Sequence, residues 1–332
     1  MTTSIAQRSD KGRAGLVGSA SVFASVLFLA AAAFGQSSQQ PPIDREEIAR
    51  RTMTTVWKPH TVPDLEYARV GKISLCLDLY LPGTKGPHPL FVWIHGGAFL
   101  SGDKARIFWT PAPKLAERGI AVASINYRLS GQATFPALVQ DAKAAVRWIR
   151  ANAVKYAIKA DLIVVGGESA GGYLAAMLGT TGDVSALEDL SMGNPKESSR
   201  VQGVVDFFGP TDFLQMDAGV PRGCEKPVAH NTPESPESRL LGCILQACPD
   251  KVKAANPIAY VSKDDPPFLI LHGTGDCLVA PNQSQLIHDA LKATGVRSEL
   301  HLLPRLAHAD RRFITPENER IVDDFLYSIL KR

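Results

Sequence analysis

The stretch LIVVGGESAGGYLAAM, residues 162–177, decides the fold. Its first residues, 162–166, form a short apolar run that predicts a buried strand, and the residues from 170 onward predict a helix. Between them, Ser169 stands two residues from Gly167 and two from Gly171. Glycine allows close backbone approach, and a sharp corner forces the residue at its apex into a strained conformation. The sequence therefore predicts a strand–turn–helix corner that holds the Ser169 hydroxyl clear of the backbone.

The rest of the chain repeats this rhythm of short apolar runs and helical stretches. Two early runs, 66–70 and 73–81, predict strands, and alternating leucines make the second a half-buried antiparallel strand. Continuous apolar runs, typical of strands covered on both faces, follow at 90–94, 120–126, 162–166, 204–208, 268–272 and 298–303. Helical stretches are expected at 110–118, 136–153, 170–179, 281–293 and 316–331. This alternation predicts an α/β fold with a mostly parallel central sheet and helices on both faces.

The amino-terminal residues form a segment of their own. Residues 1–35 begin with a basic stretch and continue as an apolar run rich in Ala and Ser, which predicts a signal peptide cleaved near residues 33–36. An uncleaved anchor is the alternative, because the run is long enough to span a bilayer. We therefore expect an exported protein, periplasmic or extracellular, with no stable membrane insertion after cleavage. Residues 36–64 read as a spacer that includes one short helix.

Charge argues against one class of partner. The full chain has a formal net charge of +3. Removal of the leader takes away three basic residues and one acidic residue, which leaves a charge of about +1. A nearly neutral mature chain does not favour nucleic acid as a partner.

Export changes how the five cysteines are interpreted. Outside the cytoplasm disulfides persist, so Cys224, Cys243, Cys248 and Cys277 are expected to form two bridges, with all three pairings open. Cys76 lies in the strand at 73–81 and is expected to be a lone buried thiol. A zinc site is disfavoured, because no tight CxxC or paired histidines accompany these cysteines. We expect no metal and no organic cofactor.

One long segment interrupts the alternation of strands and helices. Residues 209–262 contain many prolines, three cysteines and little periodicity. An insertion of this size is either a lid or pocket wall, or a stapled surface excursion without a role in the site.

The serine corner matches G-x-S-x-G, the motif of a nucleophile held between strand and helix. A serine hydroxyl needs a base, and the base needs an orienting acid, which in this architecture follow in the order Ser, acid, His. Asp276 follows the strand at 268–272, and His308 follows the strand at 298–303. Both therefore reach the same sheet edge as Ser169. We expect His308 to take the Ser169 proton while Asp276 holds the imidazole.

Other histidines and acids fit structural roles better. Two strand histidines are expected to serve packing or backbone hydrogen bonds, and one aspartate after a strand ranks behind Asp276 as the acid. The remaining candidates lie on a helix or in a loop. These residues are His272 and His301, Asp212, and His288, Asp289 and Asp310.

A second loop offers donors for a negatively charged oxygen. The run LFVWIHGGAFLSGD, residues 90–103, follows a strand and places Gly96 and Gly97 where backbone N–H groups can approach a substrate oxygen. The N–H of Ala170, next to the serine, would be the other donor. His95 is expected to brace this loop.

Together these motifs resemble the α/β-hydrolase superfamily. HGGAF, NYRLS, FPALVQDAKAAVRWIRANA, GGESAGG, FGPTDF, DDPPFLILHGTGD and the late His308 match its carboxylesterase branch, near the hormone-sensitive-lipase group and bacterial feruloyl and acetylxylan esterases. The likeness covers residues 65–332. It implies the α/β-hydrolase fold, a triad of Ser169, Asp276 and His308, and an oxyanion hole of Gly96, Gly97 and Ala170.

The sequence departs from this family pattern in two places. Ala307 precedes His308, where a glycine is usual, so the loop is expected to be shaped differently. The amino-terminal cap is reduced to about the length of residues 36–64, which makes the 209–262 insertion the candidate replacement lid.

The expected activity is that of an exported serine esterase. It would hydrolyse carboxylic esters, of short acyl chains or of acetyl or feruloyl groups on plant polysaccharides, through an acyl-enzyme. The alternatives are an amide-cleaving relative such as an arylformamidase, and a non-catalytic binding protein on the same scaffold. The natural ester, the acyl-chain limit and the oligomeric state stay open at this stage.

Overall fold

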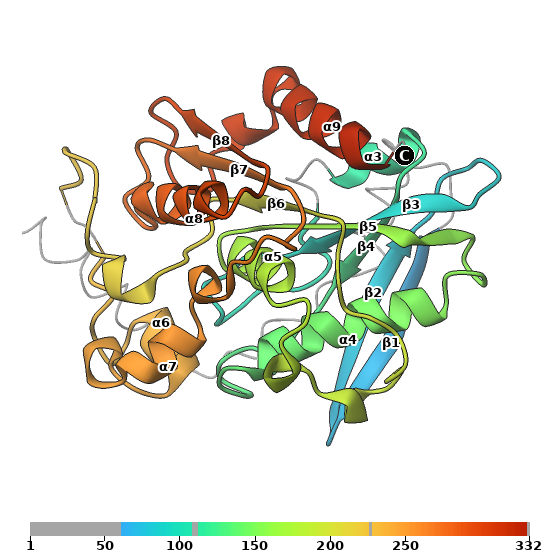
Figure 1. Cartoon of the computed structure of the whole chain (residues 1–332), viewed down its shortest axis with the longest axis horizontal. Coiled ribbons are helices and arrows are strands. Elements are labelled where there is room, and N and C mark those ends of the chain that lie inside the picture. Colours follow the sequence, from blue (N-terminus) through green and yellow to red (C-terminus); the bar gives the residue numbers. More distant parts are fainter. Residues whose placement is uncertain (1–60, 108–111, 226–227, 331–332) are drawn as a thin grey trace, which may run out of the picture. The chain divides into compact units, whose positions relative to one another are not determined.

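A computed structural model describes residues 61–107, 112–225 and 228–330 of the chain (Figure 1). The expected signal peptide and all but the end of the 36–64 spacer, including its short helix, lie outside these residues. The structure is described here only over these ranges.

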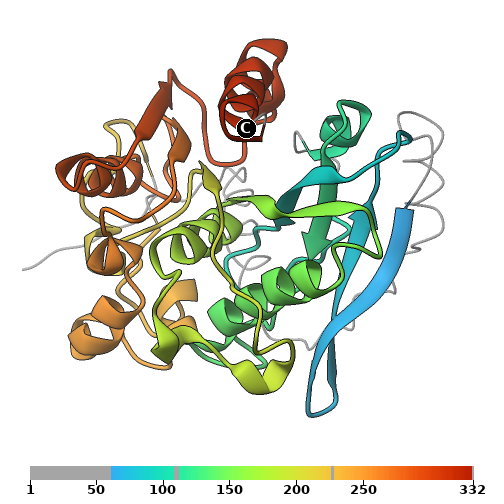
Figure 2. The ribbon, with the colours of Figure 1, turned by 45° about the vertical axis from the view of Figure 1, so that its right-hand side comes forward.

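The core of the fold is one eight-stranded sheet (Figures 1 and 2). Its strands in chain order are β1 (Thr61–Val70), β2 (Ile73–Tyr80), β3 (His88–Ile94), β4 (Ala121–Ile125), β5 (Ile158–Glu168), β6 (Gly203–Phe207), β7 (Phe268–Gly273) and β8 (Ser298–Leu303). Their order across the sheet is β1-β2-β4-β3-β5-β6-β7-β8. β2 pairs antiparallel with both β1 and β4, and every later pairing is parallel. The mostly parallel α/β sheet expected from the sequence is confirmed.

Helices cover both faces of this sheet. The helices are α3 (Ala112–Glu117), α4 (Ala137–Ala151), α5 (Ala170–Thr180), α6 (Pro236–Leu241), α7 (Pro249–Ala254), α8 (Asn282–Ala293) and α9 (Pro316–Leu330). One apolar core joins the sheet to α4, α5 and α8, and the other joins the opposite face to α3 and α9. Along β3, Leu90 and Val92 enter the first core while Phe91 and Trp93 enter the second. Because both faces are buried, the strands read as continuous apolar runs.

The 209–262 insertion folds as short helical pieces rather than as a sheet layer. Its described residues, 209–225 and 228–262, contain α6, α7 and three 3-10 turns. Two disulfides form, as expected: Cys243–Cys248 within the insertion and Cys224–Cys277 between the insertion and the loop after β7.

The fifth cysteine is free, but the expectation that it is buried was wrong. Cys76 is half-buried, with Ser74 Oγ 3.3 Å from its sulfur. Side chains alternate along a strand. The neighbouring Leu75 and Leu77 take the core-facing positions of β2, so Cys76 lies on the opposite, less covered face of the strand.

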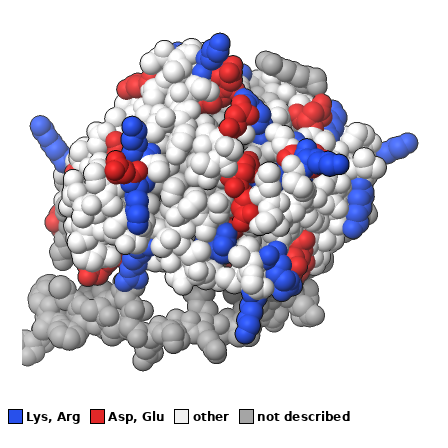
Figure 3. Space-filling view, turned by 60° about the horizontal axis from the view of Figure 1, so that its bottom comes forward, with Lys and Arg blue, Asp and Glu red and all other residues white. Residues whose placement is uncertain are grey.

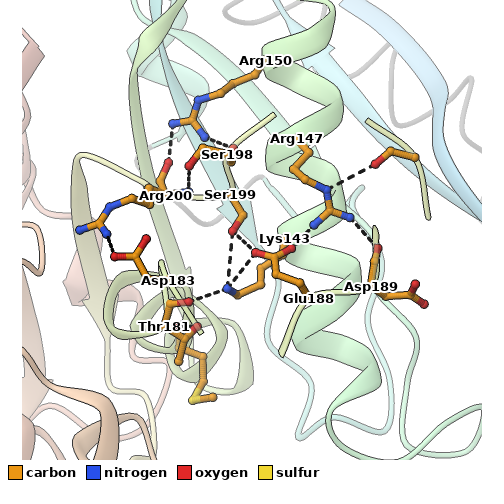
Figure 4. A network of polar contacts seen from close by, with 12 residues as sticks. Lys143, Arg147, Arg150, Thr181, Asp183, Glu188, Asp189, Ser198, Ser199 and Arg200 are labelled. Carbon is orange, nitrogen blue, oxygen red and sulfur yellow. Dashed lines mark hydrogen bonds and ion pairs between the residues drawn. The ribbon is translucent and has the colours of Figure 1, made fainter. Parts of the chain in front are cut away.

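A buried polar network fastens the segment after α5 to α4 (Figure 4). Lys143 and Arg147 lie on α4, and their side chains are almost entirely buried. Glu188 pairs with both, at 3.0 Å from Lys143 Nζ. Lys143 Nζ also donates to the Thr181 carbonyl at 2.5 Å, and Arg147 donates to the Asp189 carbonyl at 2.7 Å. The one carboxylate thus balances one of the two buried positive charges, and backbone carbonyls solvate both cations.

One face of the molecule shows how its charged side chains are distributed. On the face that Figure 3 shows, Lys and Arg side chains are scattered among acidic ones and separated by uncharged surface, without a continuous basic stripe. Within the described part of the chain, no helix has the length and apolar character needed to cross a membrane.

Candidate active site

Ser169 occupies the corner between β5 and α5. Its backbone angles are φ 52° and ψ −118°, in a region that residues other than glycine rarely adopt and that costs about 1–3 kcal/mol. Its N–H donates to the Phe207 carbonyl at 2.9 Å, and its own carbonyl accepts from the N–H of Tyr173 at 3.0 Å. These bonds to β6 and α5 hold the strained conformation in place.

The flanking glycines are required by the space around them. A Cβ atom on Gly167 would lie 2.4 Å from the Gly171 carbonyl group, and one on Gly171 would lie 2.0 Å from the Ile94 carbonyl oxygen. Backbone therefore fills both positions, which confirms that the two glycines allow the start of α5 to contact β5 and the end of β3.

The structure brings the three residues of the expected triad together. His308 Nε2 lies 2.9 Å from Ser169 Oγ, and His308 Nδ1 lies 2.7 Å from Asp276 Oδ2. Asp276 is fully buried, whereas His308 keeps 15% of its side chain exposed. Because a carboxylate only accepts, Nδ1 carries the proton and Nε2 is left to accept the Ser169 hydroxyl proton.

Asp276 is fixed within its own turn. Its Oδ1 accepts from the N–H groups of Leu278 and Val279, both at 2.9 Å. Its Oδ2 also lies 3.3 Å from His272 Nε2. Burial opposes ionisation of Asp276, but the hydrogen bonds from His272 and His308 outweigh it and hold the pKa of this carboxyl well below its usual range. A carboxylate held ionised in this way can stabilise an imidazolium.

His272 makes the backbone hydrogen bond expected of it, and it also contacts the Asp276 carboxylate. Its Nδ1 lies 2.6 Å from Ser284 Oγ, and its Nε2 lies 2.9 Å from the Val279 carbonyl oxygen. The same Nε2 faces Asp276, a contact that the sequence analysis missed although the HGTGD spacing puts the two residues four apart.

Phe208 is another neighbour of the triad that the sequence did not reveal. Its ring packs edge-on against the His308 imidazole, with centroids 4.8 Å apart, and it packs in a tilted arrangement against Phe313, with centroids 4.6 Å apart. It has φ 45°, at the turn that follows β6. In the His308 loop the left-handed residues are Arg305 and Ala309, so Ala307 before the histidine carries no such strain.

The loop after β3 lies against the serine corner. Gly97 has φ +125°, and a Cβ there would lie 2.0 Å from the Ser101 carbonyl oxygen. His95 Nδ1 lies 2.8 Å from the Gly96 carbonyl oxygen, and its ring stacks on Tyr127 at 4.4 Å. Burial lowers the pKa of His95 to about 4, so the ring is neutral and suits the brace expected of it.

Backbone N–H groups of this loop and of the serine corner are candidate donors to a substrate oxygen. Burial raises the pKa of the Glu168 carboxyl, which lies beside the Gly96 backbone. Across the described residues, the N–H groups of Gly97 and Ala170 donate to no protein acceptor. Neither N–H is therefore committed to a protein partner.

The rival residues have structural partners of their own. The Asp212 carboxylate accepts from the Leu214 N–H and the Gln215 side chain, and that of Asp310 pairs with Arg312. The two helix residues also have partners: His288 with Ser298, and Asp289 with Gln285. His301 lies half-buried in β8. Among the residues that the structure describes, no group of three or more His, Cys, Asp or Glu side chains could hold a metal ion.

The sheet and the serine–histidine–aspartate arrangement define an α/β-hydrolase of the esterase class. A comparison with sequence models of protein families identifies the particular family. The family model described as BD-FAE matches residues 77–291, which is more than half of the chain. The chain belongs to the BD-FAE family.

Relatives of known class agree with this. The chain is 28% identical over 314 residues to esterase LipQ of Mycobacterium tuberculosis, covering 88% of this chain and 70% of LipQ. It spans about half the length of LipM and LipC of the same organism, 54% and 51%. A solved structure described as a truncated carbohydrate esterase from gut microbiota is 32% identical, with TM-score 0.75, over 82% of this chain and 97% of that one. Esterase 2 of Thermogutta terrifontis phosphonylated by sarin is 27% identical, with TM-score 0.65, over 80% and 94%. The protein is a carboxylic ester hydrolase.

Proposed function

We propose that the protein hydrolyses its esters through an acyl-enzyme on Ser169. The observation that carries this proposal is the pair of hydrogen bonds in series, 2.9 Å from Ser169 Oγ to His308 Nε2 and 2.7 Å from His308 Nδ1 to Asp276 Oδ2. Ser169 Oγ attacks the ester carbonyl carbon while its proton passes to Nε2, and Asp276 stabilises the resulting imidazolium. The imidazolium then protonates the leaving alkoxide. Water then attacks the acyl-enzyme carbonyl carbon while His308 takes its proton, and the imidazolium returns this proton to Ser169 Oγ as the carboxylic acid leaves.

The oxyanion of each tetrahedral intermediate is assigned to backbone donors. Gly97 and Ala170 have N–H groups without a protein acceptor among the described residues, which supports them as the pair. Gly96 was expected to be a third donor. It stays a proposed donor, because none of the described residues accepts a hydrogen bond from its N–H. Each true donor is worth on the order of 10²–10³ in rate.

The proposed substrates are esters of short acyl groups, acetyl or feruloyl among them, carried on carbohydrate. The similarity to the gut-microbiota carbohydrate esterase supports the carbohydrate. Structures of the Thermogutta esterase with butyrate and with propionate support a short acyl group. Export is proposed from the amino-terminal segment and from the two disulfides, which persist in oxidising compartments.

Replacing the serine tests the mechanism. Ser169→Ala is expected to abolish hydrolysis of p-nitrophenyl acetate while the protein stays folded, and Ser185→Ala, at an exposed serine, is the matched control. Retained turnover in Ser169→Ala would remove Ser169 from this role.

A panel of acetyl, butyryl, feruloyl and formamide substrates tests the specificity. Preference for acetyl or feruloyl esters supports the proposal, whereas preference for the formamide identifies an amide-cleaving enzyme. Turnover of none of the four would contradict the proposed acyl groups, and the alignment of Ser169 with His308 argues against a binding protein on this scaffold.

A further inference from the structure

The turn that carries Asp276 is held from outside by the insertion. We name residues 276–279 the acid turn. Inside it, Asp276 Oδ1 accepts from the N–H groups of Leu278 and Val279, so the carboxylate moves with the turn. On its outer side, His230 Nε2 lies 2.9 Å from the Leu278 carbonyl oxygen, and Cys277 is bridged to Cys224. Both partners belong to the 209–262 insertion.

His230 needs both of its ring protons to make its contacts. Its Nδ1 lies 2.9 Å from Glu237 Oε2, and its Nε2 faces the Leu278 carbonyl; both partners only accept. His230 and Glu237 are 3% and 4% exposed, so water does not replace either bond. Burial lowers the pKa of His230, but the bond and charge of Glu237 outweigh it and raise the pKa overall, with Asp217, which accepts the His230 backbone N–H, adding to the rise. His230 therefore ties Glu237 on α6 to the Leu278 carbonyl of the acid turn.

The disulfide makes the second link. Cys277 directly follows Asp276, and its partner Cys224 lies 53 residues earlier in the chain. The other disulfide, Cys243–Cys248, closes a short loop within the insertion and does not reach the acid turn.

The start of the insertion is anchored as well. Gln283 Oε1, at the start of α8, accepts from the backbone N–H groups of Thr211 and Asp212, both at 2.8 Å. The start of the insertion is thus bonded to α8, which follows the acid turn. Farther along, Cys224 and His230 bond the insertion to the acid turn itself. A hinged lid would not be tied to the site at so many points.

We infer that the insertion is a fixed brace for the catalytic carboxylate, in which His230 and the Cys224–Cys277 bridge are positioning groups for Asp276. This inference rests on the proposed function, because it needs Asp276 to act on His308. The brace keeps Asp276 Oδ2 at 2.7 Å from His308 Nδ1. A misplacement of about 1 Å in such a contact can cost on the order of 10² in rate. Loss of the brace therefore lowers kcat and leaves KM nearly unchanged, whereas loosening of a lid changes KM.

The matched experiment uses the two disulfides of the same insertion. The double variant Cys224→Ser/Cys277→Ser frees the acid turn, and Cys243→Ser/Cys248→Ser removes a bridge that does not touch it. Both variants are assayed with p-nitrophenyl acetate at a temperature well below the unfolding transition of either. The first variant is expected to lose kcat about 10- to 100-fold at nearly constant KM. The second is expected to keep kcat within about twofold, since it leaves the acid turn bonded. Equal kcat in the two variants, or a change in KM alone, overturns the inference.

His230 provides an independent arm. His230→Ala removes the donor to the Leu278 carbonyl, and His230→Gln retains an amide donor that reaches the same oxygen. The inference expects kcat to fall in the alanine variant and to recover in large part in the glutamine variant. If both variants lose kcat equally, the contact with Leu278 is not what positions the carboxylate.

If the Cys224→Ser/Cys277→Ser variant does not fold, chemical reduction of the Cys224–Cys277 bridge provides the same test. Cys243→Ser/Cys248→Ser retains only the bridge at Cys277, which is exposed. Dithiothreitol should then lower kcat reversibly in this variant, and an unchanged kcat after complete reduction overturns the inference. If Ser169→Ala retains turnover, the proposed function itself fails; if it is inactive while the brace variants keep full kcat, only the brace fails.

Discussion

Gly171→Ala tests the packing of the serine corner against the end of β3. A Cβ at this position would lie 2.0 Å from the Ile94 carbonyl oxygen and 2.7 Å from the His95 carbonyl oxygen. Both are backbone atoms, so no flexible side chain can move aside. Ordinary contact begins at 3.4 Å, and the start of α5 would have to move away from β3 to reach it.

Two opposing effects set the stability of this variant. Alanine in place of glycine within a helix stabilises by about 1 kcal/mol. Over-packing costs about 1–3 kcal/mol, and the upper end applies here because the clash is with backbone. The free energy of unfolding should therefore fall by about 2 kcal/mol. Moving the corner away from the loop that follows β3 by about 1 Å should also lower kcat by on the order of 10².

Urea unfolding and steady-state kinetics measure both effects. Gly131→Ala is the control, because nothing lies within 4 Å of a Cβ there and its φ is not positive. It should stay within about 0.5 kcal/mol of the wild type in stability and keep its rate. If Gly171→Ala is as stable and as active as this control, the argument that backbone contact requires glycine at the corner is refuted.

Three further substitutions test other parts of the account. Asp276→Asn should lower kcat by on the order of 10³–10⁴ with little change in KM, because an amide cannot replace the carboxylate beside the imidazole; steady-state kinetics showing a loss below tenfold would remove Asp276 from the triad. Burial raises the pKa of Asp206 to about 6 from 3.8, so the folded protein binds this proton more tightly and loses stability as the pH rises through this window. The stability of the wild type relative to Asp206→Asn should accordingly fall by about 2 kcal/mol between pH 4 and pH 7 in urea unfolding, and identical pH dependences of the two proteins would contradict the raised pKa. Glu188→Gln leaves the cations of Lys143 and Arg147 buried without a carboxylate, so it should cost about 3–5 kcal/mol in thermal or urea unfolding, and a cost below about 1 kcal/mol would show that the backbone carbonyls suffice.

Much of the fold could be predicted because its signals are local. A strand covered on both faces must be apolar at every position, as the residues of β3 are, and this pattern is visible without any knowledge of the partners. Cys76 shows the limit of such reasoning. Its strand is buried on one face only, and the exposure of the other face depends on what packs over it.

In the candidate site, too, residues with a local sequence signal could be predicted, and residues that depend on distant contacts could not. Ser169 has a local motif, and Asp276 and His308 follow strands whose ends must meet at one sheet edge, so their meeting could be predicted. Phe208 and His230 have no local signal, because each contacts a residue that is far away in the sequence.

The disulfide pairing shows the same dependence on tertiary structure. Spacing alone left three pairings open. Only the approach of the insertion to the acid turn brings Cys224 to Cys277.

The most direct test of the central claim is to identify the residue that reacts with a fluorophosphonate. Wild-type protein would be labelled to completion, digested, and its peptides mapped by mass spectrometry. The account predicts one adduct per chain on Ser169, and none in His308→Ala under the same conditions, because the hydroxyl reacts only when the imidazole takes its proton. A folded wild-type protein that carries no adduct, or carries it on another residue, would contradict the account.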